Sequence, residues 1–394
     1  MRIVVAPDSF KGCLMAWDVA RAISAGAKMA VPVAEITEIP LGDGGEGTAK
    51  ALAYAVPGAR MVSASVRDPL GRPIQAEFAV LDQHTAVVEM AAASGLGLLD
   101  PAERDPLRTD TFGTGQLIKA ALDAFGREPA GSSERTLILA VGGSATVDGG
   151  MGMLAALGAR FFDGRGNPLE SFGGGRLGDV AAADFAGLDE RLRGLRLILA
   201  SDVTNPLLGA EGAAAVFGPQ KGASPAEVAL LDRGLANLRA VVKTGAGLDL
   251  EGFAGAGAAG GVGAAAVSIL GAKFQPGIEI ALASSGFSAR AMGADLIITG
   301  EGHYDVQTLR GKAVAGVATA AAALGVPVVV LVGGIAPEAE WRLPGKVIVL
   351  PIADGPLTIQ ESHRRAAELL TMASRRAVAL FAAGYESAKG GTCK

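Results

Sequence analysis

The sequence predicts an α/β protein built on a doubly wound, Rossmann-like parallel sheet, with a second α/β domain inserted into it. Two observations carry this prediction. Strand-like apolar runs alternate with helical patterns at both ends of the chain, which is typical of parallel sheets. The middle of the chain differs, because its strands empty into longer glycine-rich loops. We therefore expect residues 1–75 and 285–394 to form a discontinuous Rossmann-like domain and residues 76–284 to form the insertion.

The N-terminal part begins with a strand at residues 2–6, too short to be the apolar core of a signal peptide. Helical spacing of the apolar residues follows, and then a second strand and a second helix. Two further strands are separated by the turn Asp68-Pro-Leu-Gly71. The expected helices are 17–29 and 48–55, and the expected strands after the first are 33–39, 60–67 and 74–81.

The C-terminal part repeats the alternation. A strand at residues 295–299 is expected to end at Gly300 and Gly302, because glycine interrupts apolar runs. A helix over 309–324, strands at 327–332 and 346–350, and a final helix over 359–383 follow. The middle contributes strands at 87–90, 137–141 and 195–200 and a helix over 113–125.

Composition narrows the class of protein. The chain has 394 residues, of which 50% are hydrophobic and 19% charged, so it can bury a large core. A net charge of −5 argues against nucleic acid as a partner. Its two cysteines lie at opposite ends, which favours a reducing, cytoplasmic setting. Residues 313–337 carry no charge, but Gly325-Val-Pro327 divides them into a helix and a strand, which argues against a membrane span.

Five predicted strands end in glycine loops that carry acids, hydroxyls or lysines. Because ligands bind outside the carboxyl ends of the strands in open parallel sheets, we expect these loops to form the rim of an active site. The alternative is that they are surface turns with solvated charges. The five groups are Asp8-Ser9-Lys11, Asp43-Glu46, Ser144-Thr146-Asp148, Asp202-Asn205 and Glu301-Asp305-Lys312.

The residue types in these loops favour phosphate chemistry. Glycines let backbone N–H groups approach an anion, and lysines neutralise phosphate. Carboxylates without histidine partners suggest Mg²⁺ or acid–base catalysis. Only three histidines are present, and no metalloprotease or serine-hydrolase motif occurs, which argues against zinc and serine-triad chemistry.

Two nucleotide motifs give weak signals. The Walker A pattern fails, since position 306 is valine and position 313 is alanine. Gly255-Ala-Gly-Ala-Ala-Gly260 matches the dinucleotide fingerprint, but the preceding residues 248–253 make a poor strand. Close packing or phosphate binding by another class of protein is favoured there, and a nicotinamide-dependent dehydrogenase of a small hydroxy acid stays as a rival. A non-enzymatic two-lobed protein that binds a small acid is a second rival.

Taken together, these loops resemble the bacterial glycerate kinases of the two-domain type. The matching runs, in order, are Ala-Pro-Asp-Ser-Phe-Lys-Gly (6–12), Pro-Leu-Gly-Asp-Gly-Gly-Glu-Gly-Thr (40–48), Gly-Gly-Ser-Ala-Thr-Val-Asp-Gly-Gly (142–150), Ser-Asp-Val-Thr-Asn-Pro-Leu-Leu-Gly (201–209), Phe-Gly-Pro-Gln-Lys-Gly-Ala (217–223), Gly-Ala-Gly-Ala-Ala-Gly-Gly (255–261) and Ile-Thr-Gly-Glu-Gly-His-Tyr-Asp-Val-Gln-Thr (298–308). The resemblance implies phosphorylation of D-glycerate by ATP with Mg²⁺. It favours the 2-hydroxyl as acceptor, and an oligomer is possible.

The resemblance and the places of the loops lead to an expected role for each candidate residue. Asp202 is the expected base, because its loop follows a strand of the insertion. Lys221 has an alternative reading as a solvated loop lysine. The expected catalytic residues are Lys11, Asp202 and Lys312; the substrate residues Asp8, Ser9, Ser144, Thr146 and Asn205; the nucleotide residues Asp43, Gly44, Gly45, Lys221, Gly257, Gly260 and Gly300; and the metal ligands Glu301 and Asp305.

The sequence departs from the family pattern at a few loop positions. Cys13 replaces a usual serine, Gly42 a usual alanine and Val147 a usual asparagine. His303-Tyr304 replaces an arginine and an aliphatic residue. We expect Val147 and His303 to remove polar or charged groups from the site, which could change substrate preference.

Overall fold

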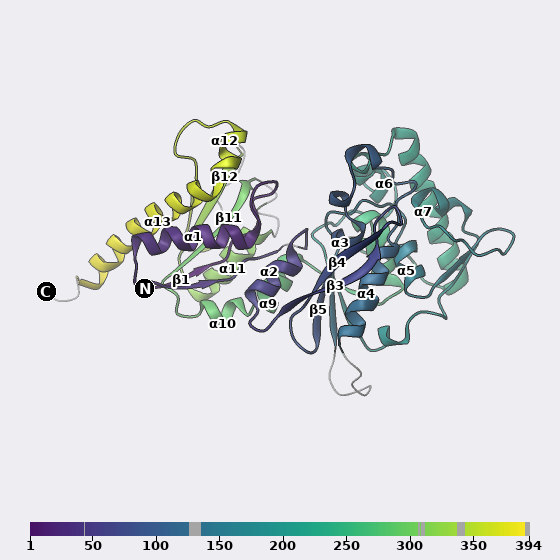
Figure 1. The fold of residues 1–394 in the computed structure, drawn as a ribbon, viewed down its shortest axis with the longest axis horizontal. Helices are drawn as coiled ribbons and strands as arrows, with labels where there is room; N and C mark the ends of the chain where they lie inside the picture. Colours follow the sequence, from purple (N-terminus) through teal and green to yellow (C-terminus); the bar gives the residue numbers. More distant parts are fainter. Residues whose placement is uncertain (43, 126–134, 306–307, 309–311, 337–342, 391–394) are drawn as a thin grey trace. The chain divides into compact units, whose positions relative to one another are not determined.

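The computed structural model describes residues 1–42, 44–125, 135–305, 308, 312–336 and 343–390. The chain forms two compact units, each with its own sheet (Figure 1). Unit 1 contains residues 1–43, 54–57 and 278–394, and unit 2 contains residues 44–53 and 58–277. The α/β fold class predicted from the sequence is confirmed.

Unit 1 is built on a five-stranded sheet in the order β13-β12-β11-β1-β2, with every neighbouring pair parallel. Ile3 of β1 lies between Leu296 of β11 and Ile36 of β2. The chain therefore continues to one side of β1 at the start and to its other side at the end, and this change of direction marks the crevice where open α/β sheets bind ligands. The strands are β1 (Arg2–Val5), β2 (Glu35–Glu38), β11 (Leu296–Tyr304), β12 (Val328–Ile335) and β13 (Val347–Pro351).

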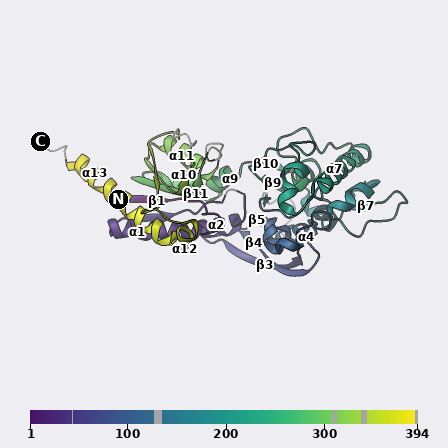
Figure 2. The same ribbon diagram turned by 90° about the horizontal axis from the view of Figure 1, so that it is seen from above.

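Helices cover both faces of this sheet. Figure 2 shows α1 and α12 on one side of β1 and β11, with α10 and α11 on the other. Helices α1 and α13 cross closely at Gly26, where a Cβ atom would lie 2.0 Å from the Thr371 carbonyl oxygen. The helices are α1 (Ala16–Ala30), α9 (Gly277–Ser284, which begins at the unit boundary), α10 (Phe287–Ala291), α11 (Ala313–Leu324), α12 (Ile359–Arg364) and α13 (Ala366–Gly390).

The sequence pattern predicts that strand β11 ends at its glycines. In the structure it continues to Tyr304. Gly300 and Gly302 lie inside it, because the neighbouring chain is too close for a side chain. A Cβ on Gly300 would lie 2.3 Å from the Leu331 carbonyl oxygen of β12. Glu301 is therefore a strand residue rather than a loop residue. The expected final helix is also divided, since α12 ends before Arg365.

Unit 2 has a six-stranded mixed sheet in the order β10-β9-β6-β5-β4-β3. Strands β5, β6, β9 and β10 run parallel, whereas β3, β4 and β5 are antiparallel neighbours. The strands are β3 (Arg60–Arg67), β4 (Pro73–Val80), β5 (Thr85–Glu89), β6 (Thr136–Ala140), β9 (Arg196–Ala200) and β10 (Lys273–Gln275), with β7 (Arg160–Phe162) and β8 (Ala182–Asp184) forming a separate pair.

The first unit boundary differs from the expected cut at residue 75, which falls inside β4. Strand β3 pairs with β4 along its whole length, from Arg60 opposite Val80 to Arg67 opposite Pro73. Hydrogen bonding thus assigns residues 60–67 to the second sheet. The second boundary, at 277/278, lies before the expected residue 285.

The helices of unit 2 enclose one apolar core with its sheet. The longest, α7, begins with a capping box between Ser224 and Glu227, with proline at its first position. The helices are α2 (Thr48–Ala55, which crosses the unit boundary), α3 (Ala91–Ser94), α4 (Phe112–Ala124), α5 (Met151–Ala156), α6 (Ala213–Phe217), α7 (Pro225–Ala246) and α8 (Val262–Ser268). In the described part of the chain, no helix has the length and apolarity needed to cross a membrane.

Candidate active site

A cavity of about 610 Å³ opens in unit 1 at the carboxyl ends of its strands. Residues after β1 and β13 and residues in or after the C-terminal parts of β11 and β12 line it, so four strand ends contribute to one concave surface. One part is polar and another is apolar. The polar lining includes Asp8, Ser9, Lys11, Glu301, His303, Asp305 and Lys312, and the apolar lining includes Phe10, Ile352, Leu357, Ile359 and Leu369.

Glu301 and Asp305 are joined through a single threonine. The Thr308 hydroxyl donates a hydrogen bond of 2.5 Å to Glu301 Oε1, and the Thr308 N–H donates one of 3.1 Å to Asp305 Oδ1. Asp305 N–H in turn donates to Thr308 Oγ1 at 3.0 Å. Glu301 is only 6% exposed, so its carboxylate has a fixed position at the cavity. Two carboxylates predicted as metal ligands thus share a wall of the cavity.

Two lysines line this cavity, one that precedes β11 in the sequence and one that follows it. Lys11 is exposed in the loop after β1, and Lys312 occupies the N-cap position of α11. Asp8 is buried, with its Oδ1 accepting the Ser9 N–H at 2.6 Å. The structure therefore brings Asp8, Lys11 and Lys312 to the same cavity as the carboxylates.

In unit 2, the loop after β6 is where the glycine loops meet. Gly142 N–H donates to the Gly44 carbonyl at 3.0 Å, and Gly149 N–H donates to the Gly260 carbonyl at 3.0 Å. A Cβ atom on Gly260 would lie 2.1 Å from the Thr146 carbonyl oxygen. The loop glycines are therefore explained by close packing of backbone against backbone. Their predicted contact with a nucleotide stays a prediction.

The remaining nucleotide candidates have the same kind of surroundings. A Cβ on Gly257 would lie 2.1 Å from the Pro206 carbonyl oxygen, and one on Gly142 would lie 2.6 Å from Gly45 Cα. Asp43 lies outside the described residues.

Asp148 anchors the end of this loop. It is fully buried and accepts hydrogen bonds from the N–H groups of Thr111, Gly150 and Gly152 and from the Thr111 hydroxyl. Burial raises the pKa of the Asp148 carboxyl, and these donors oppose that rise. The side chain thus has a structural task that the sequence pattern does not distinguish from catalysis.

Lys221 is buried, with 1% of its surface exposed, so its reading as a solvated loop lysine is wrong. Its Nζ donates to Ser144 Oγ and to the Thr146 carbonyl oxygen, both at 2.7 Å. Burial lowers the pKa of the Lys221 amine to about 7, opposed by the charge of Asp148. Ser144 and Thr146 are both buried, so these two predicted substrate residues form part of the interior in this structure.

Glu89, at the end of β5, is a residue that sequence reasoning missed. Its carboxylate accepts the Gly47 N–H at 3.0 Å and also the Ala49 N–H, so it occupies the N-terminus of α2. Burial raises the pKa of the Glu89 carboxyl, and these two bonds oppose the rise. A lone acid inside an otherwise apolar predicted strand, residues 87–90, was the available signal. This carboxylate thus satisfies two of the N–H groups at the helix end.

Asp202 is exposed in the loop after β9, and its Oδ1 accepts the Gly277 N–H at 3.0 Å. Asn205 stabilises the same loop, since its Nδ2 donates to the Glu211 carbonyl and its backbone carbonyl accepts the Gly257 N–H. Of the two candidate residues in this loop, Asp202 has the solvent-facing carboxylate, and the Asn205 side chain bonds within the loop.

The departures from the family pattern fall in different environments. The sequence leads us to expect that Val147 removes a polar group from the site. Val147 is instead fully buried in the apolar core of unit 2 and does not face an open site. Tyr304 is buried in unit 1. His303 is exposed at the cavity, and Cys13 lines it with its thiol donating to the His363 carbonyl at 3.3 Å.

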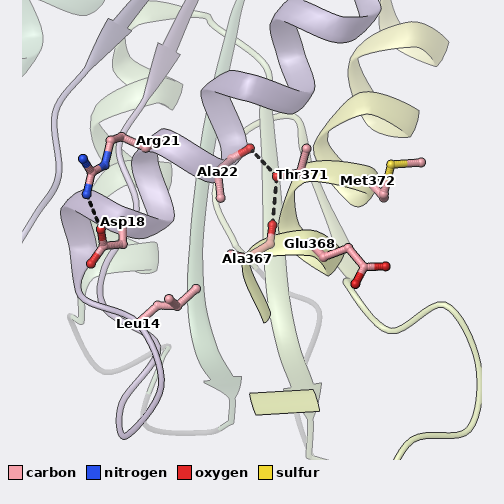
Figure 3. A pocket seen from close by; sticks show the side chains of 8 residues that line it. All are labelled: Leu14, Asp18, Arg21, Ala22, Ala367, Glu368, Thr371 and Met372. Carbon is pink, nitrogen blue, oxygen red and sulfur yellow. Dashed lines mark hydrogen bonds and ion pairs between the residues drawn. The ribbon is translucent and has the colours of Figure 1, made fainter. Parts of the chain in front are cut away.

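A second, shallower hollow of about 500 Å³ lies between α1 and α13 (Figure 3). Two of its charged groups, Asp18 and Arg21, pair with each other, and the Thr371 hydroxyl bonds to the Ala22 and Ala367 carbonyls. These bonds satisfy polar groups within the two helices. The hollow is therefore a weaker candidate than the cavity at the strand ends.

A parallel sheet whose carboxyl edge carries lysines and carboxylates around a cavity has the charged groups that a phosphotransferase needs. The chain matches the model of the Glycerate kinase family over residues 3–382, and it belongs to that family.

Relatives support this assignment over almost the whole chain. It is 43% identical to the glycerate kinase of Bacillus subtilis (strain 168), covering 95% of this chain and 96% of that protein. It is 41% identical to the glycerate 2-kinase of Escherichia coli (strain K12), covering 98% and 100%. A crystal structure from Salmonella typhimurium LT2, provisionally named glycerate kinase 2, has a TM-score of 0.84 at 42% identity, covering 98% and 99%.

Proposed function

We propose that this protein transfers the γ-phosphoryl group of ATP to the 2-hydroxyl of D-glycerate, giving 2-phosphoglycerate and ADP. Membership of the glycerate kinase family supports the reaction, and the Escherichia coli relative named glycerate 2-kinase supports the position of the acceptor. The observation that carries the proposal is the joining of Lys11, Lys312 and two carboxylates on one cavity. Neither rival reading, dehydrogenase or non-enzymatic binder, gains support from the relatives.

The unit 1 cavity is the proposed nucleotide site. Its volume of about 610 Å³ is far larger than a three-carbon acid requires, and falls in the usual range for cofactor sites. The apolar wall formed by Phe10, Ile352 and Leu369 suits a nucleobase and ribose, and the lysines suit a chain of phosphates. Phosphoryl transfer depends mainly on such positioning and charge neutralisation.

The donor set at this cavity fits Mg²⁺. Hard cations of this size bind one or two carboxylates together with substrate phosphates and waters. Glu301 and Asp305 supply two carboxylates held by Thr308. When bound, the ion would neutralise phosphate charge. The described residues contain no group of three or more candidate ligands of the histidine, cysteine and carboxylate kind.

The acceptor is assigned to the loops of unit 2. Asp202 has an exposed carboxylate that can take the proton from the attacking hydroxyl. Two N–H groups at the N-terminus of α2 already donate to Glu89, which argues against a phosphate site at Gly44 and Gly45. Asp202 is therefore the proposed general base, and the nucleotide is assigned to unit 1.

The reaction is tested by incubating the purified protein with ATP, Mg²⁺ and D-glycerate and following ADP formation. Added enolase then reports the position of the phosphate, since enolase dehydrates 2-phosphoglycerate and not 3-phosphoglycerate. We expect the product to be consumed by enolase directly. Turnover whose product needs a mutase before enolase contradicts the 2-hydroxyl, and absence of turnover by folded protein contradicts the kinase.

A further inference from the structure

Lys221 is a buried amine that the proposed reaction does not use. Its amine contacts the protein rather than solvent, with Ser144 Oγ and the Thr146 carbonyl oxygen each 2.7 Å from Nζ. The two acceptors are two residues apart in the loop after β6. One side chain thus crosslinks both ends of a three-residue segment.

The turn that carries Lys221 is itself fixed. Lys221 N–H donates to the Gly218 carbonyl, and Gly222 N–H donates to the Pro219 carbonyl, both at 3.0 Å. Gly222 has φ +101°, and a Cβ there would lie 2.1 Å from the Arg104 carbonyl oxygen. Backbone contacts therefore leave little room for the turn to move, and they fix the position of the Lys221 backbone from which the amine extends.

Both crosslinking bonds survive a change of protonation. The pKa of the Lys221 amine, lowered by burial to about 7, means that charged and neutral forms coexist near neutral pH. A protonated amine has three N–H donors, and a neutral one keeps two. Either form can serve Ser144 and the Thr146 carbonyl, so the crosslink does not depend on the charge.

Loss of the amine would leave the segment poorly held. Ser144 Oγ and the Thr146 carbonyl would lose a buried donor, and Thr146 Oγ1 already has no hydrogen-bond partner among the described residues. Unpaired buried polar groups are costly, so the segment would shift toward solvent. We propose that Lys221 is a positioning residue that fixes residues 144–146, and through them the acceptor side of the proposed kinase site, without touching ATP.

Hydrogen exchange on the full-length protein tests the positioning directly. Ala145 N–H is bonded to the Ser94 carbonyl, and Gly149 N–H to the Gly260 carbonyl, so their exchange reports the loop. We expect Lys221→Met to speed exchange at these two amides at least about tenfold. Lys119→Met, at an exposed lysine of α4, is the matched control and should leave both unchanged. Unchanged exchange in folded Lys221→Met overturns the proposal.

Kinetics separate positioning from general destabilisation, and this readout depends on the proposed function. We expect Lys221→Met to raise KM for D-glycerate at least tenfold and to change KM for ATP less than twofold, equally at pH 6 and pH 8. A rise in KM for ATP alone overturns the proposal. If the wild-type protein has no kinase activity, the proposed function fails, while the exchange result still decides the crosslink.

Ser144→Ala provides a second variant in case Lys221→Met does not fold. It removes one of the two bonds, so we expect a smaller rise in exchange at Ala145 and Gly149. In the double variant the Ser144→Ala change should add little, because its partner amine is already gone. Unchanged exchange at both amides in folded Ser144→Ala overturns the proposal even if Lys221→Met does not fold, and so does full additivity of the two changes.

Discussion

At the scale of single residues, three buried ionisable groups hold glycine loops in unit 2. Glu89 binds the start of α2, Asp148 binds the end of the loop after β6, and Lys221 binds its middle. Each accepts from or donates to backbone groups of these loops or of the helix ends beside them. A charged residue in a glycine-rich motif is therefore not by itself a ligand-binding residue. Accessibility separates these three from Asp202 and from the lysines of unit 1.

Replacing either cavity lysine should weaken the transition state. Lys11→Met or Lys312→Met removes a positive charge from the proposed phosphate site. We expect kcat/KM to fall by a factor that corresponds to at least about 2 kcal/mol of lost transition-state stabilisation, the scale of a charge-assisted contact. Steady-state kinetics measure this. Lys346→Met, an exposed lysine in the same unit, is the control and should keep wild-type values. Wild-type kinetics in both cavity variants would show that these lysines serve only as surface residues.

The carboxylates of the two units should have different tasks. Asp202→Asn removes the proposed base, so kcat should fall steeply while ATP affinity stays close to wild type. Glu301→Gln removes a proposed metal ligand, so the Mg²⁺ concentration needed for half-maximal rate should rise. Kinetics at varied ATP and Mg²⁺ distinguish the two effects. The reverse pattern, with kcat spared and ATP binding weakened in Asp202→Asn, would show that the roles are exchanged.

Asp110 should make stability depend on pH. Burial raises the pKa of its carboxyl to about 7, opposed by a hydrogen bond from the Phe112 N–H. Its folded pKa lies above its unfolded one, so the folded state binds more protons between about pH 4 and 7. The stabilisation from this group is complete below that window and is lost as pH rises through about 7. Asp110→Asn should therefore stabilise the protein at pH 8, by at most about 4 kcal/mol, and have little effect at pH 4.

Urea unfolding at the two pH values measures the Asp110 effect. Asp82→Asn is the matched control, because exposed Asp82 also accepts a backbone N–H two residues ahead, from His84. Both asparagines can keep that bond. Equal changes in the free energy of unfolding for the two variants at pH 8 would contradict a raised pKa at Asp110.

At the scale of elements, the close approach of β11 to β12 explains why glycine stands inside a strand that leads into the site. Gly300 pairs with Leu331, and Gly302 and Gly333 are also close, since a Cβ on Gly333 would lie 2.6 Å from the Gly302 carbonyl oxygen. These glycines allow the strand to continue past the apolar run and to carry Glu301 in a rigid element. A site built on a strand is positioned more accurately than one on a free loop.

Substituting Gly300 should therefore damage unit 1. The Cβ of Gly300→Ala would lie 2.3 Å from the Leu331 carbonyl oxygen, and the forced separation of β11 and β12 should cost about 1–3 kcal/mol or more. Gly355→Ala is the control in the same unit, since no atom lies within 4 Å of a Cβ there. Thermal unfolding of both variants checks the prediction, and equal transition midpoints would mean that the strands can separate freely.

At the scale of the whole molecule, each unit has its own sheet, its own core and its own group of loops. Unit 1 joins segments from both ends of the chain, and its cavity is lined entirely by those segments. Unit 2 gathers its loops around the turn after β6. This separation supports the proposal that the two substrates bind to different units, since each group of loops is stabilised by contacts within its own unit.

Ligands should therefore protect different parts of the chain from hydrogen exchange, because a ligand stabilises the state that it binds. We expect a non-hydrolysable ATP analogue with Mg²⁺ to slow exchange in residues 8–13, 300–305 and 352–369. D-glycerate should slow exchange in residues 142–150 and 201–206. Deuterium uptake by peptide mass spectrometry measures both, with α7 as an internal reference. Protection of the unit 2 loops by the nucleotide alone would contradict the assignment of substrates.

The sequence by itself determined the family and several of the elements. Alternation of apolar runs and helical patterns located α2 and β3 at their observed bounds, because periodicity is a local property. The ordered loop motifs identified the glycerate kinase resemblance. The long helix α7 was missed although its capping signal was present in Ser224, Pro225 and Glu227.

Only the tertiary structure decided which strands share a sheet and which side chains face solvent. Strand β3 belongs to unit 2 because its hydrogen-bond partner is β4, and a strand-like run does not show its partner. Gly300 lies inside β11 because β12 is close enough to exclude a side chain. Lys221 is buried and Asp202 exposed for the same reason: burial is set by contacts between segments far apart in sequence, such as Lys221 with Ser144, which no local pattern contains.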